Sequence, residues 1–310
     1  MRKGSAASLG RGVSLPAPTA LPHEALPAAP LGDVHARTAL VALALLRSAP
    51  GAGRGGALVR ALRERPGADA AALLARADED AGALAHGAIA LCARHPDRPG
   101  WIVPTIAEHF PAALALHEDG LVWALLPARE ADDAGQATTA AAQRVAARLG
   151  GRAPVGLSPF AAGPERLHDA LHQARIVLEL AGAGRLDVEE ATTGTWRLLL
   201  GLAVTDPDAL ATCVATSIGP AVEHDARLRT ELVDTFRAYL EHGANMNATA
   251  AAIYAHRHTV AARLERLGAL TRLDPLRHEH RERLGVGLKA HAVLAAASGV
   301  DVSRRGAARS

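Results

Sequence analysis

The sequence predicts a helix-rich, multidomain α+β protein, in which a small sheet packed with helices precedes an all-helical domain. Three observations predict this fold class. The 310 residues are enough for two or three domains with hydrophobic cores of their own. The middle of the chain alternates short apolar runs with helical patterns in the order β-α-β-β-α-β-α-β. The C-terminal third shows helical periodicity, and two short helices meet there at a tight corner within residues 247–267.

Composition gives little support by itself for binding to nucleic acid. Hydrophobic residues make up 49% of the chain but aromatic residues only 3%, so Ala, Leu and Val must fill the interior. The formal net charge is +2, which is too small to indicate a polyanionic partner. Only two of the 34 basic residues are lysines, and abundant alanine accompanies the arginines, so GC-rich coding explains many of them. Residues 255–283 are locally basic, with seven arginines against four acids.

The cysteines and the apolar runs predict a cytoplasmic protein. Cys92 and Cys213 are far apart and lack metal-ligand spacing, so they are interpreted as reduced core residues. The longest apolar run, residues 39–46, is far shorter than the ~20 residues of a membrane span. Arg2 and Lys3 are not followed by an apolar segment, so no secretory signal is expected.

The N-terminal part is expected to be a disordered tail over 1–31, rich in Pro, Ala and Gly, followed by a helical region over 32–85. Helices are predicted over 33–47, 57–65 and 68–77. The glycines Gly51, Gly53 and Gly56 match the letters of a dinucleotide-binding fingerprint. That fingerprint requires a preceding strand, whereas this run follows a predicted helix, so a connector is the better interpretation.

The middle segment is predicted to form a sheet with packed helices. Strands are expected over 88–93, 113–117, 121–126, 154–158 and 186–188, and helices over 101–110, 134–149 and 165–180. Asp119-Gly120 between two apolar runs is a strong signal for a hairpin. Further on, Asp206 should cap a helix that has Pro207 in its first position. Helices are also expected over 195–203, 228–241 and 276–297.

The corner within residues 247–267 is the candidate functional element. Asn247 is predicted to cap the first helix, and Val260, Leu264 and Leu267 form the inward stripe of the second. The opposite stripe holds Arg257, His258, Ala261, Ala262 and Glu265, with Arg263 and Arg266 on the flanks. Tyr254 lies at the corner, where a residue that tolerates positive φ would be easier. Spacing alone leaves two interpretations open: a DNA-binding helix-turn-helix, or an ordinary helical corner.

Residues 228–275 resemble the C-terminal helix-turn-helix of the PucR family of bacterial transcriptional regulators. The resemblance lies in Ala238-Tyr239-Leu240, Gly243, Asn245 and Arg257-x-Thr259-Val260. The sequence departs from the family pattern at His258, Ala261 and Ala262. The predicted DNA-binding residues are Asn247, Thr249, His256, Arg257, His258, Thr259, Ala261, Ala262, Arg263, Glu265 and Arg266.

The segment 86–190 resembles the GGDEF-like domain that precedes this helix-turn-helix in the PucR and sugar-diacid regulators. The matching residues are Val155-Gly156-Leu157-Ser158, Ala170, Gln173-Ala174-Arg175 and Leu125-Leu126-Pro127. The resemblance implies a GGDEF-like α/β sandwich that serves sensing or dimerisation over 86–190. It further implies a helical linker over 191–227, an all-α helix-turn-helix domain over 228–297 and a disordered tail over 298–310.

The chemistry of known GGDEF cyclases is not expected, because it needs two carboxylates that hold Mg²⁺ on the first strand and the hairpin. The first strand contains no acid, and Glu118 and Asp119 are better explained as turn residues. The pairs His256/His258 and His278/His280 lie two residues apart, where helical side chains diverge by about 200°. Ser158 lacks the glycines of a nucleophile elbow. No catalytic residue, metal or cofactor is therefore predicted.

The predicted function is a DNA-binding transcriptional regulator of the PucR type, which reads promoter DNA through the C-terminal helix-turn-helix. Double-stranded DNA, a second copy of the chain and an unknown small-molecule effector are the expected partners, and a membrane is not. A metabolite or partner would act through the upstream domain. The alternative is a protein-interaction module whose degenerate helix-turn-helix no longer reads DNA. Ala261 and Ala262 favour this alternative slightly, whereas Arg257, Arg263 and Arg266 favour the regulator.

Overall fold

The computed structural model describes residues 54–65, 70–76, 79–94, 99–128, 132 and 134–307 of the chain. The predicted tail over 1–31, the predicted helix over 33–47 and the glycines Gly51 and Gly53 lie outside these residues. The third glycine, Gly56, is inside a helix. None of the helices in the described ranges is long and apolar enough to cross a bilayer.

The first half of the described chain contains a four-stranded antiparallel sheet, in which the strands lie in the order β2-β3-β1-β4. The strands are β1 (Ala88–Arg94), β2 (Leu114–Glu118), β3 (Leu121–Pro127) and β4 (Val155–Leu157). Strand β1 is central, which explains its continuous apolar run, since both of its faces are covered. The predicted hairpin is confirmed: Asp119 and Gly120 both have positive φ, 53° and 71°, as a two-residue type I′ turn requires.

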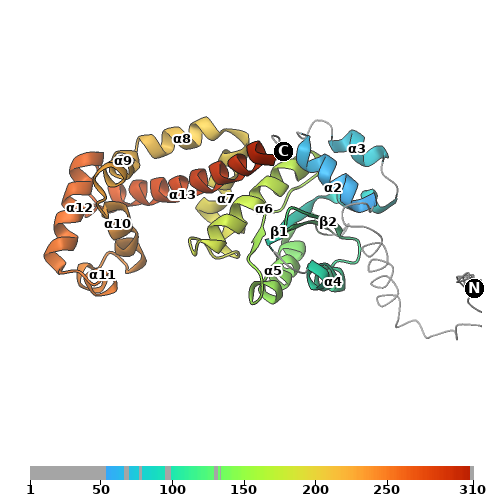
Figure 1. Ribbon diagram of the computed structural model, residues 1–310, viewed down its shortest axis with the longest axis horizontal. Coiled ribbons are helices and arrows are strands. Elements are labelled where there is room, and N and C mark those ends of the chain that lie inside the picture. Colours follow the sequence, from blue (N-terminus) through green and yellow to red (C-terminus); the bar gives the residue numbers. More distant parts are fainter. Residues whose placement is uncertain are drawn as a thin grey trace, which may run out of the picture. The chain divides into compact units, whose positions relative to one another are not determined.

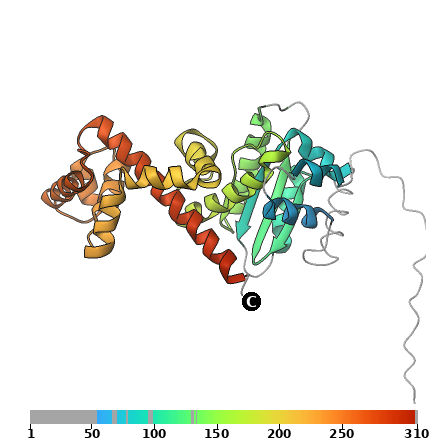
Figure 2. The ribbon, with the colours of Figure 1, turned by 90° about the horizontal axis from the view of Figure 1, so that it is seen from above.

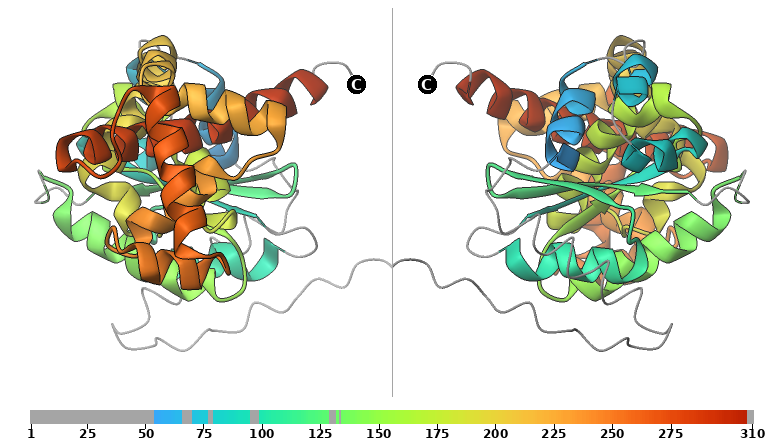
Figure 3. Two further views of the ribbon diagram at one scale, coloured as in Figure 1. Left: turned by 90° about the vertical axis from the view of Figure 1, so that its left-hand side faces the viewer. Right: turned by 90° about the vertical axis from the view of Figure 1, so that its right-hand side faces the viewer.

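Helices cover both faces of the sheet, as Figure 3 shows edge-on. On one face lie α2 (Arg54–Glu64), α3 (Ala70–Arg76) and α6 (Leu167–Gly182). On the other lie α4 (Ile102–His109) and α5 (Gln136–Gly150). Val59 and Leu62 of α2 are fully buried in the first of these cores, so the packing of the sheet includes residues before 86.

Helix α6 lies directly on β4 because Gly156 has no side chain. A Cβ atom at this glycine would be 2.2 Å from the carbonyl oxygen of Ala174 and 2.3 Å from the backbone nitrogen of Leu178. Both atoms belong to the backbone of α6, so they could not yield without moving the helix. Glycine is therefore required here for close approach of a helix to a strand.

The predicted fifth strand over 186–188 is wrong. After α6 the chain turns at Gly184 and continues without strand pairing through Leu186. The side chain of Leu186 is buried in a cluster of helical residues rather than on a face of the sheet, whereas Val188 packs against the core beside β4. Leu186 and Val188 thus pack into two different cores and do not alternate across one strand. Strand β4 remains at the edge of the sheet.

The second half is all-helical (Figure 1). Its helices are α7 (Gly194–Thr205), α8 (Pro207–Ala215), α9 (Gly219–Leu228), α10 (Leu232–Glu241), α11 (Met246–Ala252), α12 (Arg257–Thr271) and α13 (His278–Ala307). The Asp206 cap is confirmed, since its carboxylate accepts the backbone N–H of Ala209 at 3.0 Å. Helix α13 packs beside α7 and α8 (Figure 2) and continues beyond its predicted end at 297.

The helix predicted over 228–241 starts later than expected, because residues 229–231 separate it from the preceding helix. Helix α9 ends at Leu228, and Arg229 takes a left-handed conformation with φ 53°. Helix α10 then begins at Leu232, and Asp225 of α9 caps it from outside. Its two carboxylate oxygens accept the backbone N–H groups of Leu232 at 3.0 Å and Val233 at 2.9 Å. The backbone N–H groups at the start of α10, which have no acceptor within that helix, thus bond α10 to α9.

Candidate nucleic-acid interface

Helices α11 and α12 form the predicted corner, but the cap of α11 is Asn245 rather than Asn247. The side-chain oxygen of Asn245 accepts the backbone N–H groups of Asn247 at 3.0 Å and Ala248 at 3.1 Å. Asn245 has the extended backbone that a capping residue adopts, whereas Asn247 is already inside the helix. The predicted cap at Asn247 is therefore wrong, and its side chain is left exposed on the first turn.

The inward stripe of α12 is confirmed. Val260, Leu264 and Leu267 are buried, and Ala250 of α11 is buried with them in one hydrophobic cluster. Thr249, predicted to contact DNA, is fully buried, and its hydroxyl donates to the carbonyl oxygen of Asn245 at 2.7 Å. Its side chain is thus committed to the packing of the corner and cannot reach a ligand.

The corner itself has two features that determine the start of α12. Tyr254 has φ 52° and is 98% exposed, so its ring stands in solvent at the turn. His256 caps α12, and its Nδ1 accepts the backbone N–H of His258 at 3.3 Å. The two imidazole rings stack with centroids 5.0 Å apart. The expected divergence of these histidines is wrong because His256 precedes the helix and does not follow helical spacing.

The outward face of α12 is open to solvent. Its exposed residues among those predicted to contact DNA are Arg257, His258, Thr259, Ala262, Glu265 and Arg266, while Ala261 is half-buried. Arg257 is the first residue of the helix and Arg266 lies between two and three turns further on. Small side chains in the middle with cations toward both ends make a surface that a major groove can accept.

Arg263 does not belong to this open face. Its guanidinium pairs with the carboxylate of Glu231 at 2.8 Å and donates to the hydroxyl of Thr235 at 3.1 Å. Thr235 is buried and donates its own proton to the carbonyl oxygen of Glu231. Arg263, which was predicted to contact DNA, thus bonds α12 to the start of α10 in this structure. Tyr254, which the sequence placed at the corner, was not among the predicted DNA-binding residues.

The hairpin carboxylate of the upstream domain, Glu118, is already paired with cations. Glu118 is held by two guanidinium groups of α2, with Arg60 Nε at 2.9 Å and Arg63 at 2.5 Å. Arg63 also lies over the ring of Trp123, 5.1 Å from its centroid. Asp119 occupies the left-handed turn position. Among the residues that the structure describes, no three His, Cys, Asp or Glu side chains are grouped to hold a metal ion.

Cys92 is confirmed as a core residue. It lies on β1, is fully buried and is not in a disulfide, and burial raises the pKa of its thiol to about 12. The neighbouring Arg175 opposes this shift without cancelling it. Cys213, also unpaired, is only partly buried on α8. A thiol with such a high pKa is a poor nucleophile and a poor metal ligand.

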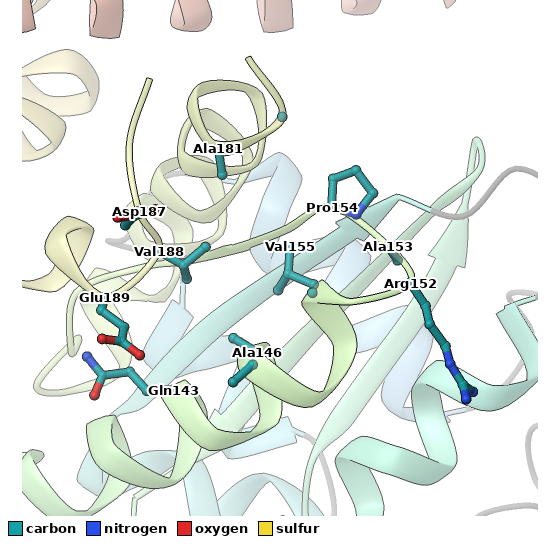
Figure 4. Close-up of a pocket in the computed structure, with 13 residues that line it drawn as sticks. Gln143, Ala146, Arg152, Ala153, Pro154, Val155, Ala181, Asp187, Val188 and Glu189 are labelled. Carbon is teal, nitrogen blue, oxygen red and sulfur yellow. The ribbon is translucent and has the colours of Figure 1, made fainter. Parts of the chain in front are cut away.

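The upstream domain also carries a cavity of about 680 Å³ between α5, the start of β4 and the segment after α6. Ala146, Val155 and Val188 form its apolar floor, as Figure 4 shows. Gln143 and Glu189 lie together at one end, and Arg152 projects away from them at the other (Figure 4). The Arg152 guanidinium lies over the ring of Trp101, 5.7 Å from its centroid.

Two family models match the chain, in the order that the resemblance implied. The GGDEF-like domain matches residues 57–180, and the PucR C-terminal helix-turn-helix domain matches residues 232–290. Solved structures that match include a regulator of polyketide synthase expression from Bifidobacterium adolescentis. It is 17% identical, and the match covers 66% of this chain and 84% of that chain with a TM-score of 0.31, too low to support an argument. No curated protein sequence matches.

Proposed function

Since the chain belongs to the PucR-type transcriptional regulators, we propose that it binds promoter DNA through the outward face of α12, under the control of its upstream domain. The observation that carries this proposal is the division of α12 into two faces. Val260, Leu264 and Leu267 are buried, while the opposite face is exposed from Arg257 onward. The GGDEF-like domain then serves regulation rather than nucleotide turnover, because Glu118 is neutralised by arginines.

Different parts of the α12 face have different roles in this proposal. Arg257 at the helix N-terminus is positioned to reach base edges, as is usual for recognition helices. A bidentate contact of arginine with guanine discriminates between bases by roughly 1–3 kcal/mol. Arg266, which has no ion pair within the described part of the chain, is the proposed phosphate contact, because Arg263 is paired with Glu231. His256, His258 and Thr259 surround Arg257 and complete the N-terminal end of the surface.

We further propose that the active species is a homodimer. One recognition helix contacts few base pairs, and helix-turn-helix proteins gain affinity by pairing half-sites about one helical turn apart. In this proposal the GGDEF-like domain also includes α2, which packs on the sheet and lies within the family match. Light scattering of the full chain, with and without bound DNA, tests the dimer. A monomer under both conditions would reject it.

The proposed DNA binding is tested by in vitro selection of random duplexes with the full chain. Arg257→Ala should relax the preference at one position of the selected half-site. Arg266→Ala should weaken binding to all sequences alike and lower the slope of log affinity against log salt concentration by about one. Arg197→Ala is a matched control, because it removes an exposed arginine on α7, away from the corner. If no sequence is enriched, the chain is instead the protein-interaction module that Ala261 and Ala262 slightly favour.

A further inference from the structure

A second cavity, of about 800 Å³, lies where three parts of the chain meet. One wall is the segment from Gly184 to Trp196, which connects the GGDEF-like domain to α7. Another is the C-terminal half of α10, and the third is one face of α13 between His278 and Ala292. The outward face of α12 has no part in it. The cavity is therefore distinct from the proposed DNA-binding surface but adjoins two helices of the same matched domain.

Positive charge from three separate elements converges on this cavity. Arg185 comes from the turn after α6, Arg237 from α10, and Arg281 and Lys289 from α13. Three carboxylates, those of Glu190, Glu241 and Glu282, also line the cavity, and Glu282 lies 3.3 Å from the His278 ring, a contact that is ionic only when this histidine is protonated. Within the described residues Arg185 is exposed and has no ion pair. At least one guanidinium at the cavity is thus available to an incoming anion.

The field of these cations reaches a neighbouring histidine on α13. Burial lowers the pKa of His291, and the positive charges of Arg185 and Arg237 lower it further. Of these two cations, Arg237 pairs with Asp234 on its own helix, whereas Arg185 has no ion pair within the described residues. An anion bound between them would remove part of this repulsion.

The cavity also has an apolar side suited to the body of an organic ligand. Trp196 is 7% exposed, and the ammonium group of Lys289 lies over its ring, 5.2 Å from the centroid. Leu240 and Leu288 line the same space. An apolar wall with a few converging charged groups is typical of small-molecule sites.

We propose that this cavity binds a small organic anion, whose carboxylate or phosphate group is held by Arg185 and Lys289 and whose apolar part packs beside Trp196. The ligand joins the segment after α6 to α10 and α13, so its presence restrains the helices that support α12. Arg263 bonds α12 to the other end of α10, which gives the ligand a path to the recognition helix. The regulatory part rests on the proposed function, whereas the binding part does not.

The test uses 8-anilinonaphthalene-1-sulfonate, an anion with an apolar body, and its neutral analogue N-phenyl-1-naphthylamine. The full chain should bind the sulfonate at least tenfold more tightly than the neutral analogue, because one charge-assisted contact supplies that factor or more. Arg185→Gln and Lys289→Gln should each lower the affinity for the sulfonate about tenfold and leave the affinity for the neutral analogue unchanged. Arg197→Gln, next to Trp196 but outside the cavity, should change neither affinity. Displacement by benzoate or by phenyl phosphate then distinguishes the two anionic groups.

Equal binding of the two dyes, or unchanged sulfonate binding by both cavity variants, overturns the site. Because the titration contains no DNA, failure of the proposed DNA binding cannot affect it. The coupling is measured separately by hydrogen exchange with the sulfonate bound. Slower exchange in residues 237–244 and 278–292 supports the coupling. Unchanged exchange in both segments means that the ligand does not restrain α10 and α13, although it still binds in the cavity.

Discussion

Replacing Arg263 with alanine should loosen α12 from α10 while leaving the exposed face of α12 intact. The guanidinium contacts Glu231 at 2.8 Å and the Thr235 hydroxyl at 3.1 Å, and both partners belong to the start of α10. Thr235 is buried, so replacing Arg263 with alanine removes the N–H group from which the Thr235 hydroxyl now accepts a hydrogen bond. The stem of Arg263 also covers part of the packed surface, because its side chain is only 28% exposed.

The expected cost follows from the exposure of the two contacts. The carboxylate partner is 65% exposed, so the ion pair with Glu231 contributes only about 0.2–1 kcal/mol after screening. The hydrogen bond from a charged donor to a buried hydroxyl contributes about 1.5–3 kcal/mol. Since Arg263 is itself partly solvated, we expect a total near the low end, about 2 kcal/mol. That corresponds to a change of roughly 30-fold in the local opening equilibrium.

Native-state hydrogen exchange measures this change without requiring the whole chain to unfold in one step. Peptides from α10 and α12 should exchange about 30-fold faster in Arg263→Ala, by the same conversion. Arg266→Ala is the matched control on the same helix, and it should leave exchange unchanged while weakening DNA binding. The reasoning is refuted if Arg263→Ala exchanges like the unmodified chain and instead lowers the salt slope of DNA binding by about one. Arg263 would then contact phosphate.

Three further results are expected. The full chain should not convert GTP to cyclic dinucleotides with Mg²⁺, and turnover that disappears in Glu118→Gln would contradict this expectation. Iodoacetamide at pH 8 should label Cys213 but not the buried Cys92 in the folded chain, because a pKa of about 12 leaves roughly one Cys92 side chain in 10⁴ as thiolate. Peptide mapping that finds the label on both cysteines would contradict this. Gly287→Ala should lose about 1–3 kcal/mol of stability, since its Cβ would lie 2.0 Å from the hydroxyl of Ser217. Adding Ser217→Gly should restore most of the thermal midpoint, and no restoration would argue against this contact.

Elements set by local chemistry could be predicted from the sequence. The Asp119-Gly120 hairpin needs only two adjacent residues that accept positive φ. The helix that begins after Asp206 needs only a capping carboxylate and a following proline. The inward stripe of α12 follows from helical spacing alone. In each case the physical cause lies within a few residues, so the pattern predicted the observed structure.

The errors occur where backbone conformation or a distant residue decides between local alternatives. Asn245 and Asn247 both have the side chain of a cap, and backbone conformation selects the first. The segment around Leu186 has the composition of a strand, but a helical core buries its side chain. Arg263 and Arg266 look equivalent on the flanks of one helix. Only the position of Glu231, far back in the sequence, removes the first of them from the exposed surface.

Helix α6 has consequences for how a change in one half of the chain reaches the other. One of its faces, with Leu171, Ala174 and Leu178, is part of the core of the sheet. Another, with Ile176 and Leu180, is part of the cluster that contains buried residues of α7, α10, α12 and α13. At Gly156 the backbone of α6 lies directly on β4, so a single helix connects the two cores without an intervening loop. We therefore expect a displacement of one core to reach the other through α6 itself.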